Sequence, residues 1–275
     1  MANISAADVK RLRDMTGAGM MDCKKALEAS DGDFDKAVEF LRVKGQASAD
    51  KRADRATSNG LVAVHVDGGV ATMVEVACET DFVAKGENFT VLADHVLNAA
   101  VSAGAGDVES VLAAKTSDGR TVADVVLEAN ATIGEKIEIR RAARVEAPYI
   151  ASYLHRTSPD LPPQIGVLIG LDSENPVGRD VAMHAAAMSP GYLKRDDVPA
   201  DVVSSERRIA EEKSREEGKP EQALPKIIEG RVNAFFKDNV LLEQSFAKDP
   251  SKTIQKLLDE SGAQVVSLTR FKVGA

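Results

Sequence analysis

The sequence has few cysteines and lacks a long hydrophobic run. Only Cys23 and Cys78 occur among its 275 residues, too few for a disulfide scaffold, and two distant cysteines are more often reduced and buried than bridged. The longest strongly apolar run, 165–171, is far shorter than a membrane span. Five charged residues lie among the first 15, where an export signal would need an apolar segment. We therefore expect a cytoplasmic protein with no membrane partner.

The charge balance also lacks an excess of basic residues. The chain has 35 Lys and Arg against 43 Asp and Glu, a net charge of -8, which disfavours a protein that binds nucleic acid through its phosphates. Two basic runs, 51–55 and 140–144, are not flanked by aromatic residues on which bases could stack. We interpret them as solvated surface and expect no direct nucleic-acid partner.

Motifs for covalent chemistry and for metal binding are missing as well. The four histidines have no H-x-H, H-E-x-x-H or C-x-x-C companion. The glycine pairs at 17–19 and 104–106 lack the third glycine of a dinucleotide-binding loop, and there is no P-loop. Cys78 falls in an apolar strand, where a buried, inert cysteine is usual. These absences disfavour an enzyme and predict neither a metal ion nor a cofactor.

The composition is that of a folded protein, with 44% hydrophobic and 28% charged residues, and the length predicts about two domains or several smaller modules. The first 43 residues predict three short helices. Ser5 and Asp8 have the spacing of a capping box, and Ile4 and Val9 that of a hydrophobic staple. The third helix, over 34–43, has one apolar stripe that must pack on the other two.

Two stretches downstream repeat one order of elements. Strands are predicted at 60–66 and 70–78, joined by a glycine-rich turn and followed by helices and a strand at 136–145. Strands at 149–154 and 165–171 are again followed by a helix, and a strand at 263–273 ends the sequence. This recurrence predicts an α+β fold with two related halves and antiparallel sheets.

Two charged helices separate the second half from the end of the chain. Residues 201–218 are highly charged, with Val202, Val203, Ile209 and Ala210 available for burial, and Gly218 precedes a more apolar helix at 222–236. We interpret the pair as a projecting hairpin, with a last helix opening at 250–253. The predicted division is a three-helix domain at 1–45, a linker, helical in part, at 46–59, core subdomains at 60–146 and at 147–190 with 237–275, and the hairpin at 191–236.

One segment departs from these local patterns. After the strand that ends at Cys78, a large aromatic residue, Phe82, stands among polar groups at a corner between strand and helix. In one interpretation, which the pattern alone favours, Thr80 or Asp81 caps the next helix and Phe82 packs into the core. In the other, Asp81 and Phe82 project as a wedge, because aromatic residues on rigid corners are typical interface hot spots.

Several segments resemble those of the bacterial elongation factor Ts family. The two signature segments are TGAGMMDCKKAL at 16–27 and TDFVA at 80–84, and they are followed in order by HAAAMSP at 184–190, EGR at 229–231 and RFKVG at 270–274. The resemblance covers nearly the whole chain. It implies a nucleotide exchange factor for elongation factor Tu, with a ubiquitin-associated-like N-terminal three-helix domain, a two-part α+β core and an inserted helical hairpin.

The resemblance also implies which residues bind the partner. In the family, the segment that is Thr80, Asp81, Phe82 and Val83 here is held to displace the magnesium ion that helps to hold GDP in the partner. A second contact is implied for Arg13, Met20 and Met21, since methionine suits adaptable interfaces; alternatively, both methionines fill the three-helix core. His155, expected in the loop after a strand, resembles a further contact of the core.

For the assembly, we expect one-to-one heterodimers with elongation factor Tu, which could pair weakly into a dimer of heterodimers. Many family members continue into a C-terminal helical module that touches the partner, whereas this sequence ends at Ala275, so that contact is expected to be missing. The alternative function is that of a non-catalytic adaptor that binds proteins through its ubiquitin-associated-like domain.

Overall fold

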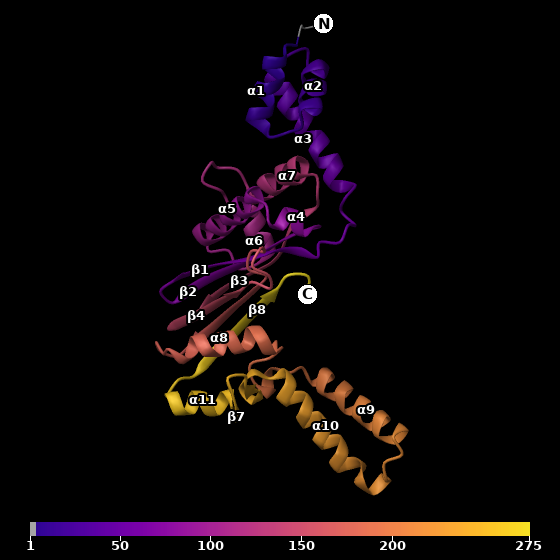
Figure 1. The fold of residues 1–275 in the computed structure, drawn as a ribbon, viewed down its shortest axis with the longest axis vertical. Coiled ribbons are helices and arrows are strands. Elements are labelled where there is room, and N and C mark those ends of the chain that lie inside the picture. The colour runs from indigo at the N-terminus through magenta and orange to yellow at the C-terminus, as the bar shows by residue number, and fades with distance from the viewer. Residues whose placement is uncertain (1–3) are drawn as a thin grey trace.

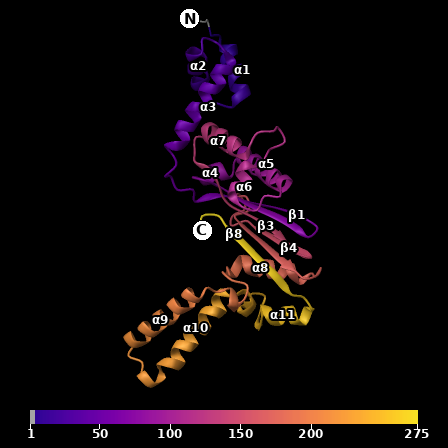
Figure 2. The ribbon, with the colours of Figure 1, turned by 180° about the vertical axis from the view of Figure 1, so that it is seen from behind.

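The protein extends along one axis as a small helical domain, a core and a helical hairpin (Figure 1). The structure, a computed structural model, describes residues 4–275, except for the side chains of 48–50. The N-terminal helices lie at one end, and the hairpin lies at the other. The view from behind shows the same order (Figure 2).

The N-terminal domain contains α1 (Ala6–Thr16), α2 (Met20–Ala29) and α3 (Phe34–Asp50). The predicted capping box is confirmed, because the Asp8 N–H donates to Ser5 Oγ at 3.2 Å and the Ser5 N–H donates to Asp8 Oδ2 at 3.0 Å. Helix α3 is longer than the stripe at 34–43 predicted, since it continues along the core and packs against α7. The buried residues of this domain are Val9, Leu12, Cys23, Ala26, Leu27 and Ala37.

The first half of the core is an antiparallel sheet in the order β1-β2-β3. Its strands are β1 (Asn59–Asp67), β2 (Val70–Cys78) and β3 (Ile137–Glu146). Between β2 and β3 lie α4 (Asp81–Ala84), α5 (Glu87–Ala103), α6 (Val108–Ala113) and α7 (Val122–Ile133). Helix α5 packs on one face of this sheet, with Phe89 and Val96 buried against Val74 and Val76 of β2.

The second half repeats this plan with β4 (Tyr149–His155), β5 (Ile165–Leu171) and β8 (Val265–Lys272), in the order β4-β5-β8. Helices α8 (Val177–Met188) and α11 (Ile254–Ser261) lie between β5 and β8 in the chain. Met73 and Val62 from the first sheet pack against Leu168 and Phe271 from the second. The predicted α+β class with two similarly ordered halves is confirmed.

Two local predictions about the second half are wrong. Residues 250–253 do not open a helix but belong to β7 (Asp249–Thr253), which pairs with β6 (Ser245–Phe246). The helix starts later because the Thr253 hydroxyl accepts the Lys256 N–H at 3.2 Å and so caps α11. His155 is also not in a loop, since it is the last residue of β4 and pairs with Ile165.

The inserted hairpin consists of α9 (Ala200–Glu216) and α10 (Leu224–Asn239), which pack on each other and project from the core (Figure 1). Short 3-10 turns at 195–197, 221–223 and 241–243 flank them. Ala210 and Ser214 are the buried residues of α9, so the expectation that Ile209 is buried is wrong. Since successive helical residues are about 100° apart, burying Ala210 turns Ile209 towards solvent.

Candidate protein-binding site

Residues 80–83, called the T-D-F-V segment below, form the corner between the central strand of the first sheet and the helix that follows it. Strand β2 ends at Cys78, and α4 begins three residues later. Thr80 is the N-cap, with an extended backbone (φ −120°, ψ 157°) and a hydroxyl that accepts the Val83 N–H at 3.4 Å. Helix α4 has only four residues, so its shape depends on contacts with the rest of the core.

Phe82 projects from this corner and is 82% exposed. The interpretation in which Phe82 packs into the core is therefore wrong. The side chain that enters the core is Ala84, which is buried, and Val83 is half-buried against the same cluster. Because Val83 and Ala84 hold the inner face of α4, Phe82 is directed away from the core.

Asp81 and Lys85 form an ion pair beside Phe82. Lys85 Nζ lies 2.7 Å from Asp81 Oδ2 and 5.9 Å from the centre of the Phe82 ring. The hydrogen bond from Lys85 lowers the pKa of Asp81, and the same bond raises the pKa of Lys85. Both side chains are partly exposed, so the pair adds little to stability. It does place one charge of each sign beside an exposed aromatic ring.

The carboxylate of Glu135, between α7 and β3, binds the backbone just before α4. It accepts hydrogen bonds from the Thr80 N–H at 3.0 Å, the Glu79 N–H at 3.2 Å and the Thr80 hydroxyl at 2.6 Å. No sequence pattern indicated Glu135, because it lies 55 residues from Thr80 in the chain. Only the pairing of β2 with β3 brings the two together.

Cys78 supports the corner from inside and is not a reactive thiol. Its side chain is buried, and its Sγ donates to the Thr80 carbonyl oxygen at 3.3 Å. Burial, followed by the negative charge of Glu135, raises the pKa of Cys78 to about 12. The thiol is therefore protonated at neutral pH and acts as a hydrogen-bond donor.

The N-terminal residues singled out from the sequence lie where α1 turns into α2. Gly17 ends α1 with φ 66°, and α2 begins at Met20. Arg13 is exposed on the last turn of α1, and Met20 and Met21 are 47% and 63% exposed. The interpretation in which both methionines fill the helical core is therefore wrong. Met15, which the sequence pattern did not single out, is also exposed.

His155 is exposed at the end of β4, where its Nδ1 lies 3.2 Å from the hydroxyl of Tyr153. The residues on either side of it, Leu154 and Arg156, line a shallow hollow that Lys85 borders from the end of α4. The fold therefore brings the segment around His155 and the T-D-F-V helix to the same hollow.

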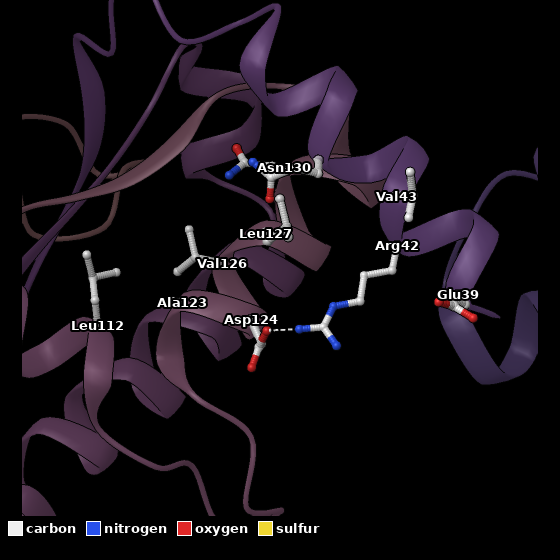
Figure 3. A pocket seen from close by; sticks show the side chains of 10 residues that line it. Glu39, Arg42, Val43, Leu112, Ala123, Asp124, Val126, Leu127 and Asn130 are labelled. Atoms are coloured by element: carbon white, nitrogen blue, oxygen red, sulfur yellow. Dashed lines mark hydrogen bonds and ion pairs between the residues drawn. The ribbon is translucent and has the colours of Figure 1, made fainter. Parts of the chain in front are cut away.

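Helix α3 of the N-terminal domain contacts helix α7 of the core. Figure 3 shows a hollow between α3 and α7, in which Arg42 reaches across to Asp124 with a 2.5 Å contact. Val126, Leu127 and Asn130 of α7 line the hollow from the core side. On the other side of the junction, Arg52 donates to the Asn130 carbonyl oxygen at 3.0 Å.

The described part of the chain offers this surface no metal centre. Among the side chains that the structure describes, 4–47 and 51–275, there is no cluster of three or more His, Cys, Asp or Glu arranged to hold a metal ion. Within the same range, no helix is both long and apolar enough to span a bilayer. Exposed aromatic, methionine and charged side chains on an α+β frame make this surface a candidate protein-binding site.

Comparison with known proteins identifies the family of this chain. The family model for elongation factor TS matches residues 79–275. The elongation factor Ts of Kineococcus radiotolerans is 61% identical over 100% of both chains. Those of Acidothermus cellulolyticus and Thermobifida fusca are 59% and 57% identical, over 100% of this chain and 99% of theirs. This chain belongs to the elongation factor Ts family, and it is a translation elongation factor.

Proposed function

We propose that this protein is a guanine nucleotide exchange factor that binds elongation factor Tu in its GDP-bound and nucleotide-free states. Family membership supports this role. The observation that carries the mechanism is Phe82, a large aromatic side chain that is 82% exposed on a helix fixed to the core. An exposed aromatic residue at such a corner suits insertion into a partner.

In this mechanism, Phe82 enters the packed interior of elongation factor Tu near its nucleotide site. Magnesium bridges the phosphate oxygens of a bound nucleotide and is the largest positive charge there. A wedge that shifts the elements carrying the metal ligands would dislodge the ion and weaken GDP binding, because packed cores move between discrete arrangements. No covalent bond forms or breaks, so the protein is not an enzyme in the chemical sense.

The other residues of the segment have supporting roles. Thr80 caps α4, and Val83 packs the helix on the core. Asp81 offers a carboxylate next to the wedge, where it can meet basic or N–H groups of the partner. Its lowered pKa keeps this carboxylate ionised at neutral pH.

Arg13, Met20 and Met21 would form a second contact, with the nucleotide-binding domain of the partner, and His155 a third. Their exposure supports these assignments. The second contact lies on the N-terminal domain, whereas Phe82 lies on the core, so the partner would bind two separate surfaces of this protein. We propose a one-to-one heterodimer, which the exposed hairpin could pair weakly into a dimer of heterodimers.

Thermodynamic linkage relates the two binding steps of the cycle. The factor by which this protein weakens GDP binding must equal the factor by which GDP weakens its own binding to the partner. GTP in excess then refills the vacant site and releases the exchange factor for another round. This cycle serves translation elongation, in the cytoplasm.

The proposal is tested by stopped-flow release of fluorescent GDP from elongation factor Tu. Wild-type protein should accelerate release, and Phe82→Ala should reduce the acceleration roughly 30-fold, as expected for a hot-spot residue. Val266→Ala is the control, because Val266 is an exposed apolar residue of β8 that has no proposed contact with the partner. Phe82→Ala should keep the melting temperature of the wild type, since truncating an exposed side chain leaves no core cavity.

If wild-type protein fails to accelerate release, the exchange function is wrong, and the adaptor alternative becomes the better hypothesis. If Phe82→Ala stimulates release as fast as Val266→Ala, exchange does not depend on the wedge.

A further inference from the structure

We infer that Glu135 is the positioning residue for the exposed Phe82, because its carboxylate fixes the backbone and the capping hydroxyl from which α4 starts. This inference rests on the exchange function proposed above and names a residue outside the T-D-F-V segment. Glu135 would not touch the partner.

The first observation is where the sheet ladder stops. The pairing of β2 with β3 ends at Cys78 opposite Ile137. Beyond that point, the backbone N–H groups of the two segments donate to side-chain carboxylates instead of backbone carbonyl groups. Glu135 accepts the N–H groups of Glu79 and Thr80, and the Glu79 carboxylate accepts the Lys136 N–H at 2.6 Å. The corner is thus joined in both directions to the start of β3.

The second observation is a relay through the cap. The Thr80 hydroxyl donates to Glu135 Oε1 at 2.6 Å, so its lone pairs remain free to accept the Val83 N–H. The Glu135 contact therefore selects the rotamer of Thr80 that caps α4. A four-residue helix is not stable alone. Loss of this cap would therefore let α4 unfold locally, and the Phe82 side chain would no longer be held in one orientation.

The third observation is how Glu135 itself is held. Gly134 ends α7 with φ 84°, a conformation that favours glycine and reverses the chain so that Glu135 faces β2. Glu79, whose N–H group binds Glu135, is itself held by two side chains. The Arg55 guanidinium donates to the Glu79 carboxylate at 3.3 Å, and the Asn59 side-chain amide donates to the Glu79 carbonyl oxygen at 2.9 Å. The carboxylate thus lies in a prepared position.

Hydrogen–deuterium exchange of the free protein tests the contact without the partner. Oε2 of Glu135 accepts both N–H groups, and the side-chain oxygen of a glutamine could replace it, so the variant is Glu135→Ala, which leaves no side-chain acceptor for them. The amides of Glu79 and Thr80 should then exchange roughly tenfold faster than in wild type. The matched control is Glu109→Ala, at an exposed position of α6. Unchanged protection of both amides in Glu135→Ala would overturn the inference, whatever the outcome of any nucleotide-exchange assay.

A double-mutant cycle in GDP release separates positioning from general destabilisation. If Glu135 acts through Phe82, Glu135→Ala should slow stimulated release roughly tenfold in the wild-type background but have no further effect in Phe82→Ala. Equal effects in both backgrounds would show a merely structural role and overturn the inference. Failure of wild-type protein to stimulate release would instead reject the proposed function, and the amide protection would still decide the Glu135 contact.

Discussion

Gly45 of α3 packs closely against Ala131 of α7. A Cβ atom added to residue 45 would lie 3.2 Å from the Cβ atom of Ala131. The Arg42–Asp124 ion pair joins the same two helices (Figure 3). Both charged side chains are well exposed, so the pair contributes at most about 1 kcal/mol. Close helix packing therefore holds the N-terminal domain on the core, with the ion pair as an addition.

Replacing Gly45 should weaken this junction. Gly45→Val places a branched side chain against Ala131, and overpacking of this kind costs about 1–3 kcal/mol. We expect trypsin to cleave within 51–58 roughly fivefold faster or more, because the segment is then less constrained. Gly230→Val is the matched control, since Gly230 also lies in a helix but a Cβ atom added there would meet nothing within 4 Å. Equal cleavage rates for the two variants would mean that the junction does not depend on this contact.

A buried ion pair should matter far more. Glu75 of β2 is fully buried, with Arg141 Nε at 2.5 Å from its Oε2, and the Arg141 guanidinium lies 4.8 Å from the centre of the Phe271 ring. Arg141→Leu leaves a buried carboxylate uncompensated, and urea denaturation should show a loss of about 3–5 kcal/mol. The double variant Glu75→Leu, Arg141→Leu should recover much of this loss.

The control for that experiment is Arg144→Leu on the same strand, whose partner Glu146 is exposed. It should lose at most about 1 kcal/mol. If Arg141→Leu is no less stable than this control, Glu75 does not need its partner.

His184 should make stability depend on pH. It is 2% exposed; its Nδ1 accepts the Ala247 N–H at 3.1 Å, and its Nε2 lies 2.9 Å from Gln244 Oε1. Burial lowers its pKa below the ordinary 6.5. As pH falls through 6.5, the unfolded chain binds a proton that the folded protein does not, so the free energy of unfolding decreases, by at most about 1.4 kcal/mol per pH unit.

This dependence is measured by urea denaturation between pH 7 and 5.5. His184→Gln should flatten the profile in that interval, because it removes the buried titrating group. The other three histidines are exposed and remain as an internal control. An unchanged slope in His184→Gln would assign the pH dependence to other groups.

Cys78 should be unreactive in the folded protein. With a pKa of about 12, about one molecule in 10,000 carries the thiolate at pH 8, and the side chain is buried. Ellman's reagent should therefore label neither Cys78 nor the buried Cys23 on the time scale of minutes, and should label both at once in urea. Rapid labelling of folded Cys23→Ser protein would show that the corner around Thr80 opens readily.

Several parts of the fold were predictable because neighbours in the sequence decide them. The Ser5 cap, the Gly68 turn and the amphipathic helices all depend on residues a few positions apart. The wrong prediction at 250–253 also concerns residues that are close in the sequence. There β7 pairs with β6, and Thr253 caps α11, so the helix begins only after Thr253. Which face of α9 is buried could not be predicted, because α10 determines it.

The candidate site divides in the same way. The sequence by itself identified the T-D-F-V segment, the strand before it and the methionines after Gly17, through local pattern and family resemblance. Only the tertiary structure decided that Phe82 is exposed and that Glu135 binds Thr80. Burial depends on what packs against a side chain, and contacts between residues 55 positions apart exist only once β2 and β3 have paired.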